Sequence, residues 1–412
     1  MLNGPFSPWP SFTQDEANSV SSVLLSNQVN YWTGQECRKF EREFADWCEA
    51  DHSIALANGT MALDLALVGL GVGSRNGGAP EDEVIVTPRT FLASVSTVVN
   101  AGAVPVFAEV DADSGNITAE TIRQAQSPNT KAIVVVNLAG WPCDIHPIME
   151  LANRHNIKVV EDCAQAHGAR YKGKPVGSIG HVGAWSFCQD KIMTTGGEGG
   201  MVTTNDRDLW SKMWSYKDHG KNWQAVYERE HPPGFRWLHE SFGTNWRMME
   251  MQAAIGRIQL KRMPEWTQAR SKNAEIITDA LQPFSDENGP IRVPNFRCPS
   301  CDSSTNDNGC THAYYKYYAY VRSENLKPDW NRDRIVDEIN LRGVPCFQGS
   351  CSEVYLEKAF DGTGWRPKNR LPIAKELGES SLMFLVHPTL TDREISKTAS
   401  VIKEAMTLAS IR

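Results

Sequence analysis

The middle of the chain alternates between short strand-like runs and helix-like segments, and this alternation limits the possible folds more than any other pattern. Strand-like runs lie at residues 53–57, 83–87, 104–110, 131–138, 158–162 and 182–188. Helices are expected between them at residues 61–70, 92–101, 118–126 and 145–153. Such alternation is typical of βαβ units that build a mostly parallel sheet. Residues 133–136 are apolar on both faces, as expected of a strand covered by helices on both sides.

The C-terminal third of the chain predicts a second, smaller unit. Residues 313–322 alternate aromatic and small side chains, which indicates a strand. A helix at 332–341 and a strand at 343–347 are expected to follow. A long helix is also expected at residues 249–262, where Pro264 should interrupt it. We therefore predict an α/β protein with a three-layer αβα large domain at residues 14–262 and a smaller α+β domain at residues 263–412.

Charge and composition exclude several classes of protein. The chain has 412 residues and a formal net charge of -7, whereas nucleic-acid and membrane-surface binders usually need a basic face. Residues 1–12 contain neither the basic stretch nor the apolar run of a secretory signal. No apolar run approaches the length of a membrane-spanning helix. We therefore expect a cytoplasmic protein that binds neither nucleic acid nor membrane.

Ten cysteines raise the question of disulfides or a metal site. In the cytoplasm thiols stay mostly reduced, and single cysteines are common core residues. Cys298, Cys301 and Cys310, followed by His312, lie in or beside a polar loop at residues 296–311 and have the spacing of a possible zinc knuckle. An insertion with incidental thiols explains the same residues, and we expect no metal.

Two motifs follow predicted strands at the sheet edge where ligands bind. The sequence EDCAQAHG at residues 161–168 places Asp162 at a strand end, where a buried carboxylate needs a cation or a donor. A simpler explanation is an aspartate that caps a following helix, with Gln165 exposed. The sequence WSFCQDK at residues 185–191 places Lys191 beside a glycine-rich turn, where a desolvated lysine can form a Schiff base. A surface lysine at a hairpin turn is the simpler alternative.

Two shorter motifs could contact other parts of a ligand. Asn58-Gly59-Thr60 lies between a strand and a helix, and the free amides of such a helix start can bind phosphate. The same three residues also form an ordinary helix N-cap. Phe91 follows a strand end, where its ring could stack on a flat ligand or pack in the core.

In this order, the motifs resemble those of the DegT/StrS-type sugar aminotransferases, within the fold-type I pyridoxal-phosphate enzymes. The resemblance covers residues 28–388 and rests on EDCAQAHGA, WSFCQDK, TTGGEGGMVTTND and FGTNWRMMEMQAA. It implies that Lys191 is the catalytic lysine, which holds pyridoxal 5'-phosphate and carries the proton in the 1,3-shift. It assigns the remaining cofactor contacts as follows: Asp162 to the pyridine nitrogen, Gln165 to the phenolic oxygen, Phe91 to the ring face, Gly59, Thr60 and Ser186 to the phosphate, and Asn245 to the phosphate of the neighbouring subunit in a homodimer.

The same resemblance implies a class of substrate. L-glutamate, or L-glutamine, donates the amino group, and the acceptor is a keto group of a nucleotide-linked sugar used in amino-sugar and surface-polysaccharide biosynthesis. A keto-cyclitol is an alternative acceptor because it is also a polyhydroxylated ketone. A non-catalytic regulatory protein that binds the cofactor is a further alternative. Lys191 argues against the family's dehydratase branch, which carries histidine at that position.

A few positions depart from the family pattern or indicate substrate contacts. Asp190 stands where relatives often carry a small or neutral residue, and we expect it to face away from Lys191. Trp141 replaces an expected glutamine at a position near the substrate. The phosphates of a sugar nucleotide need local cations, which one polar stretch could supply from Lys217, His219, Lys221, Arg229 and Arg236. A solvated surface loop explains this stretch equally well.

Overall fold

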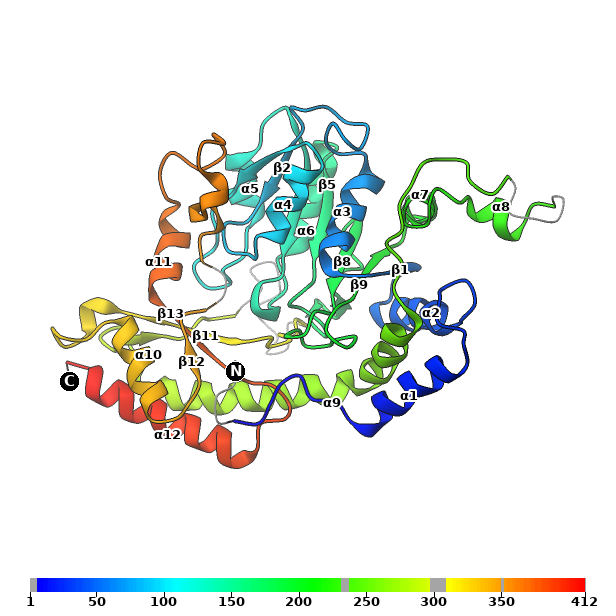
Figure 1. Ribbon diagram of the computed structural model, residues 1–412. Coiled ribbons are helices and arrows are strands. Elements are labelled where there is room, and N and C mark those ends of the chain that lie inside the picture. The colour runs from blue at the N-terminus through cyan, green and yellow to red at the C-terminus, as the bar shows by residue number, and fades with distance from the viewer. Residues whose placement is uncertain (1–5, 231–236, 297–308, 350–351, 412) are drawn as a thin grey trace.

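The N-terminal half of the chain is built on a seven-stranded sheet (Figure 1). The structure is a computed structural model that describes residues 6–230, 237–296, 309–349 and 352–411. The strand order is β1-β9-β8-β5-β4-β2-β3, with the bounds β1 (His52–Leu56), β2 (Glu83–Val86), β3 (Val104–Phe107), β4 (Thr130–Val136), β5 (Lys158–Asp162), β8 (Val182–Ser186) and β9 (Gly200–Thr204). Strand β9 is antiparallel to β1 and β8, and the other pairs are parallel. The predicted mostly parallel sheet is confirmed.

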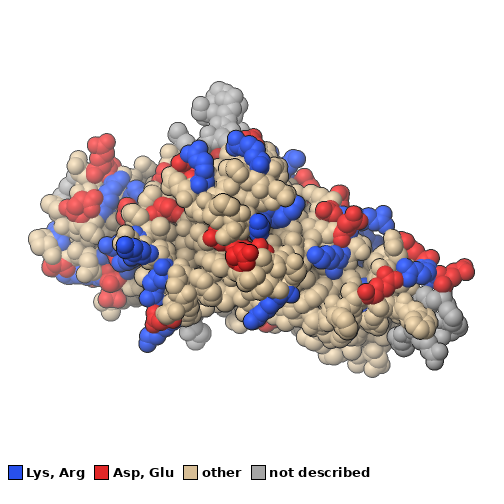
Figure 2. Space-filling view, turned by 90° about the horizontal axis from the view of Figure 1, so that it is seen from above, with Lys and Arg blue, Asp and Glu red and all other residues tan. Residues whose placement is uncertain are grey.

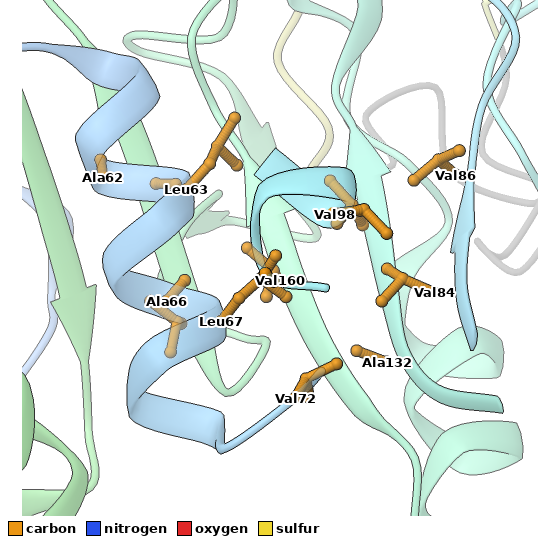
Figure 3. Close-up of a cluster of buried hydrophobic side chains, with 14 of the residues drawn as sticks. Ala62, Leu63, Ala66, Leu67, Val72, Val84, Val86, Val98, Ala132 and Val160 are labelled. Atoms are coloured by element: carbon orange, nitrogen blue, oxygen red, sulfur yellow. The ribbon is translucent and has the colours of Figure 1, made fainter. Parts of the chain in front are cut away.

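Helices cover both faces of this sheet because its central strands are apolar on both. The covering helices include α3 (Gly59–Leu70), α4 (Ala93–Asn100), α5 (Ala119–Ala125) and α6 (Ile145–Arg154). Val84 and Val86 of β2 join the apolar cluster beneath α3 and α4, which Figure 3 shows. Ile85, between them, points to the opposite face and packs with α5 and α6. Alternate residues of a strand face opposite sides, so one sheet supports two apolar layers.

A smaller antiparallel sheet follows in the C-terminal part of the chain. Its order is β10-β11-β13-β12, with the bounds β10 (Ile291–Arg292), β11 (Tyr317–Val321), β13 (Ser381–Phe384) and β12 (Cys346–Phe347). Helices α10 (Arg332–Leu341) and α12 (Asp392–Ala409) contribute to the core on one face. Tyr318 and Tyr320 of β11 belong instead to a core shared with the larger sheet and α11 (Pro372–Ser380). This is the smaller α+β unit that the sequence predicts.

One long helix, α9 (Glu250–Leu281), runs along both units (Figure 1). The prediction that Pro264 interrupts it is wrong, because the helix continues for 32 residues with Pro264 inside. An internal proline costs roughly 3 kcal/mol through a lost hydrogen bond and a steric clash. Helix α9 packs against α1 (Gln14–Leu25), α2 (Glu36–Cys48) and α12, and this packing outweighs that cost. The predicted domain division between residues 262 and 263 falls inside α9 and stays a prediction.

The remaining described elements are short or peripheral. They are α7 (Arg207–Lys217), α8 (Trp223–Tyr227), β6 (Arg170–Tyr171), β7 (Lys174–Pro175) and the 3₁₀ turns Leu138–Gly140, Gln282–Phe284, Ser323–Asn325, Val354–Leu356 and Lys358–Phe360. In Figure 1 the segment that carries α8 extends away from the body of the molecule.

Several strands end earlier than predicted, such as β3 at residue 107 and β8 at residue 186. Two further differences arise because distant segments meet. Strand β4 ends at residue 136 instead of 138, and the chain enters the 3₁₀ turn Leu138–Gly140. The strand predicted from residue 313 begins only at residue 317. The amides of Ala313 and Tyr315 donate to carbonyl groups of that 3₁₀ turn and not to a neighbouring strand. Strand β9 was not predicted, because its sequence follows a glycine-rich turn and has no clear strand pattern.

The surface carries charges of both signs. Figure 2 shows acidic and basic side chains interspersed over the face seen from above. Among the helices of the described ranges, none combines the length and the hydrophobicity that crossing a membrane requires.

Candidate active site

A cavity of about 650 Å³ lies at the carboxyl ends of β5 and β8, beside the first turn of α3. Cavities of this size are typical of cofactor and small-molecule sites. Seven residues that the sequence singles out line it: Gly59, Thr60, Phe91, Asp162, Gln165, Ser186 and Lys191. They come from segments that are far apart in the sequence, so the order of the strands brings them together.

Asp162 ends strand β5 and places a buried carboxylate in the cavity wall. Its Oδ2 accepts a hydrogen bond from the Ser94 hydroxyl at 2.8 Å, and its Oδ1 accepts one from the Ala164 amide at 3.1 Å. Burial raises the pKa of this carboxyl group, and the two hydrogen bonds oppose the rise. The chain forms turns after Asp162, so the alternative of a helix cap is wrong. A buried carboxylate in a cavity wall suits a positively charged ligand atom.

The Lys191 side chain is only 15% exposed, so the alternative of a surface lysine is wrong. Its Nζ lies 3.8 Å from Asp190 Oδ1 and 5.2 Å from the centre of the Tyr315 ring. The Tyr315 hydroxyl donates a hydrogen bond to Asp190 Oδ2. The prediction that Asp190 faces away from Lys191 is therefore wrong. Both residues lie in a turn after β8, where consecutive side chains need not alternate as they do in a strand.

The start of α3 forms a cradle at one end of the cavity. Asn58 caps the helix, and its Oδ1 accepts a hydrogen bond from the Met61 amide at 3.0 Å. The amides of Gly59 and Thr60 have no acceptor inside the helix and, with the helix dipole, favour an anion. A Cβ on Gly59 would lie 2.4 Å from the Ser186 Cβ, so glycine is needed for this close approach. The cradle of helix start and Ser186 hydroxyl suits a phosphate group.

Gln165 and Phe91 present an amide and an aromatic ring to the same cavity. Gln165 is buried, and its Oε1 accepts a hydrogen bond from the Ala139 amide at 2.8 Å. This hydrogen bond from the Ala139 amide fixes which end of the Gln165 side-chain amide is the oxygen. The ring of Phe91 is 69% exposed, which excludes the alternative of core packing. An exposed ring at a cavity mouth is available for stacking on a flat ligand.

Trp141 is not among the described residues that line this cavity. Its buried ring lies 5.2 Å from the Phe296 ring and 5.7 Å from the His312 ring, measured between centres. These contacts account for the residue as part of an aromatic cluster. The role of Trp141 in substrate binding stays a prediction.

The polar stretch with several predicted cations divides into a buried part and an exposed part. Lys217 is fully buried, with Nζ 3.7 Å from the centre of the Tyr31 ring. Lys221 Nζ lies 3.3 Å from Asp218 Oδ1 and 3.8 Å from the centre of the Trp32 ring. The remaining described members, His219 and Arg229, are exposed and do not line the cavity. Asn245, which the resemblance assigns to the phosphate of the neighbouring subunit, is also exposed and does not line the cavity of its own chain. Arg236 lies outside the described residues.

Four further acidic or hydroxyl side chains in the cavity escaped the sequence analysis: Asp64, Thr90, Ser94 and Glu198. Burial raises the pKa of Asp64 to about 6, and Glu198 adds a second carboxylate. Ser94 donates to Asp162, and its Oγ lies 2.7 Å from the Thr90 hydroxyl.

The possible zinc knuckle lies partly outside the described residues. Cys298 and Cys301 are not among the described residues. Cys310 is half-buried, and its Sγ accepts a hydrogen bond from the Lys172 amide at 3.3 Å. Within the described ranges, no group of three or more histidine, cysteine or acidic residues is arranged to hold a metal ion.

A three-layer α/β fold with a lysine, a buried carboxylate and the start of a helix in one cavity is compatible with the class of aminotransferases. The chain belongs to the DegT/DnrJ/EryC1/StrS aminotransferase family, whose model matches residues 10–403. The family and the aminotransferases named among its relatives together show that the protein is a transaminase, and the resemblance seen in its motifs is confirmed.

Similar proteins and structures agree with this membership. The chain is 44% identical over 372 residues to the GDP-perosamine synthase of Caulobacter vibrioides, and the match covers 89% of this chain and 89% of the relative. It is 32% identical over 386 residues to the dTDP-3-amino-3,4,6-trideoxy-alpha-D-glucose transaminase of Streptomyces venezuelae, covering 94% of this chain and 90% of the relative. The solved structure of an aminotransferase from Psychrobacter cryohalolentis is 64% identical, with a TM-score of 0.93, and covers 98% of this chain and 99% of that one.

Proposed function

We propose that the protein uses pyridoxal 5'-phosphate to move the amino group of L-glutamate to a keto group of a nucleotide-linked sugar. The observation that carries this proposal is the meeting of Lys191, Asp162 and the start of α3 in one cavity. The names of the two relatives, a GDP-perosamine synthase and a transaminase of a dTDP-linked amino sugar, support a nucleotide-linked acceptor. Amino-sugar and polysaccharide biosynthesis is the setting that such an activity serves.

The cavity residues fit the chemical groups of pyridoxal phosphate. The fit assigns Gly59, Thr60 and Ser186 to the phosphate, Asp162 to the ring nitrogen, Gln165 to the phenolic oxygen, Phe91 to the ring face and Lys191 to the aldehyde carbon. The cradle at Gly59, which a Cβ would fill, supports the phosphate assignment. The buried Asp162 carboxylate, which needs a cation, supports the assignment to a protonated ring nitrogen. When bound, the cofactor supplies a carbonyl group that captures amines and a ring that accepts electrons.

Two side chains do most of the proton handling in this proposal. Lys191 Nζ takes a proton from the α-carbon of the amino-acid donor. In the 1,3-shift it then delivers a proton to the carbon across the transferred nitrogen. Asp162 keeps a proton on the ring nitrogen, because its buried carboxylate stabilises a positive charge there. Gln165 is held by the Ala139 amide and donates to the phenolic oxygen with its own amide group.

The acceptor is tested by running the reaction in reverse. The holoenzyme is incubated with 2-oxoglutarate and, separately, with GDP-perosamine, dTDP-3-amino-3,4,6-trideoxy-alpha-D-glucose or an amino-cyclitol. We expect L-glutamate to form with at least one nucleotide-linked amino sugar and not with the amino-cyclitol, as measured by mass spectrometry. Formation only with the amino-cyclitol supports a keto-cyclitol aminotransferase. Cofactor binding without any transfer supports a regulatory protein, and both outcomes contradict the proposal.

We further propose that the protein is a homodimer in which each subunit completes the other's cavity. Among the described residues, Lys191 is the only cationic side chain that lines the cavity, against four carboxylates: Asp64, Asp162, Asp190 and Glu198. A phosphate that carries about two negative charges needs further donors or cations there. Residues 237–249 carry Asn245 and strongly exposed apolar side chains, with Phe242 100% and Trp237 73% exposed. Exposed apolar groups of this size favour an interface with a second copy.

The dimer is tested by complementation between two inactive variants. In a symmetric dimer with shared sites, Lys191→Ala mixed with Asn245→Ala gives mixed dimers that hold one intact site. At equal amounts and after random reassociation, about a quarter of the wild-type site number should return. A molar mass of one chain by light scattering, or activity no higher than the sum of the two variants alone, contradicts shared sites.

A further inference from the structure

The carboxylate of Asp190 lies beside Lys191. Asp190 Oδ1 is 3.8 Å from Lys191 Nζ, and the Tyr315 hydroxyl holds the other carboxylate oxygen by a hydrogen bond. Asp190 also lines the 650 Å³ cavity. Although burial opposes it, the Lys191 ammonium and the Tyr315 hydroxyl lower the pKa of Asp190, so this carboxyl group is ionised at neutral pH.

The other acidic and neutral groups around Lys191 do not replace Asp190. Burial raises the pKa of Asp162, whose oxygens are already bonded to Ser94 and Ala164. Burial also raises the pKa of Cys188, which therefore stays a neutral thiol. His167 is neutral as well, because burial lowers its pKa to about 3. Glu198 lines the cavity as an exposed carboxylate, without an ion pair to Lys191 among the described residues.

Other cationic side chains lie near Lys191, and their mutual repulsion is reduced by the negative charge of Asp190. Burial, Arg270 and Lys191 lower the pKa of Lys316 to about 8, and its Nζ lies 5.1 Å from the centre of the same Tyr315 ring that Lys191 approaches. Arg270 keeps its charge at neutral pH although burial lowers its pKa to about 9. Lys316 is therefore repelled by two other cations, Arg270 and Lys191, and Asp190 is the carboxylate that offsets this repulsion.

We propose that Asp190, held by Tyr315, is a positioning residue that receives the Lys191 ammonium group whenever Lys191 is not bonded to the cofactor. The inference rests on the proposed function, in which Lys191 must leave the cofactor when the donor amine takes its place. Lys191 Nζ lies 3.8 Å from Asp190 Oδ1, so the carboxylate is within reach of the ammonium group. Held there, Nζ stays next to the cavity, so it can exchange a proton with the substrate and bond to the cofactor again.

The test measures the proton on Lys191 directly in the cofactor-free protein. Lysines are reductively methylated with ¹³C, and the Lys191 signal is assigned by its loss in Lys191→Arg. We expect Asp190→Asn to move the titration midpoint of this signal down by about one unit, because an opposite charge within roughly 4–6 Å stabilises the protonated form. Tyr315→Phe keeps the charge but frees the carboxylate, so a smaller downward shift is expected. Glu198→Gln removes a charge from the same cavity and should move the midpoint by less than about 0.3 units.

A second measurement uses the holoenzyme and separates positioning from substrate binding. In single-turnover reactions with L-glutamate, Asp190→Asn should lower the rate constant about 10- to 100-fold and leave the half-saturating concentration of L-glutamate unchanged. An unchanged Lys191 midpoint in both Asp190→Asn and Tyr315→Phe overturns the proposal. If the wild type does not respond to pyridoxal phosphate or amino acids at all, the proposed function fails, and the cofactor-free titration still decides whether Asp190 holds Lys191. If Asp190→Asn does not fold, Tyr315→Phe carries both measurements.

Discussion

Replacing Lys191 with alanine is expected to lower the rate of amino transfer by about 10⁴-fold or more, the upper range for a general acid–base group. The proposed covalent bond to the cofactor would be lost as well, so the loss should exceed that of a proton-transfer group alone. In the structure no other lysine lines the cavity among the described residues, so the chain has no ready replacement.

The measurement combines activity with covalent labelling. Wild-type protein incubated with pyridoxal phosphate should be yellow, and borohydride reduction should attach the cofactor to the peptide that carries Lys191. The Lys191→Ala variant should lose both signals and keep the wild-type unfolding temperature within a few degrees. Lys316→Met is the matched control, because Lys316 lies beside the same Tyr315 ring but should not affect the label on Lys191. A labelled peptide elsewhere in the wild type contradicts the assignment.

Replacing Asp162 with asparagine is expected to lower the rate of amino transfer by about 10²- to 10⁴-fold. Breaking a buried charge pair typically costs 3–5 kcal/mol, which corresponds to rate factors of about that size. The Asp162 carboxylate is buried and held by Ser94, so its charge is fixed in the cavity wall. An asparagine keeps the shape but cannot stabilise a proton on the ring nitrogen. Single-turnover kinetics with L-glutamate measure the effect on the amino-transfer step itself.

The neighbouring Glu161 provides a matched control for this variant. Glu161 is also a buried carboxylate of β5, but it accepts hydrogen bonds from the amides of Gly177, Ile179 and Gly180 on the other side of the strand. Glu161→Gln should therefore lower the free energy of unfolding by about 1–3 kcal/mol through lost hydrogen bonds. It should leave the amino-transfer rate of the folded protein nearly unchanged. Equal rate losses in both variants would show that Asp162 acts through stability and not on the cofactor.

Element types were predictable where local pattern and packing agree. Strand β5 and helix α10 have the predicted bounds, 158–162 and 332–341. The apolar run of β5 gives way to Glu161 and Asp162, and α10 is followed by Arg342 and Gly343, which end its helical period. The predictions failed where a distant segment intervened. The packing of α9 against three other helices overrides the local cost of Pro264, and hydrogen bonds from Ala313 and Tyr315 to the turn after β4 delay strand β11.

The candidate site shows the same division. Gly59, Phe91, Asp162 and Lys191 were predictable because each stands at a strand end or helix start, and the four motifs match those of a known family. The direction of Asp190 was predicted wrongly, since it depends on the Tyr315 hydroxyl, which the smaller unit brings to the cavity from far along the chain. Ser94 was missed because a serine in a helix has no visible partner until β5 places Asp162 beside it.

The sequence by itself determined the parallel α/β fold, the family and the residue types at the strand ends, because hydrophobic periodicity, capping and motif order are local properties of a chain. Only the tertiary structure decided which of those residues share one cavity, that Lys191 faces Asp190, and that the cationic stretch after α7 lies away from its own cavity. Strand order and helix packing bring these groups together across long separations in sequence. Burial then raises the pKa of Asp162 and lowers that of Lys316, whereas Lys191 and Tyr315 lower the pKa of Asp190.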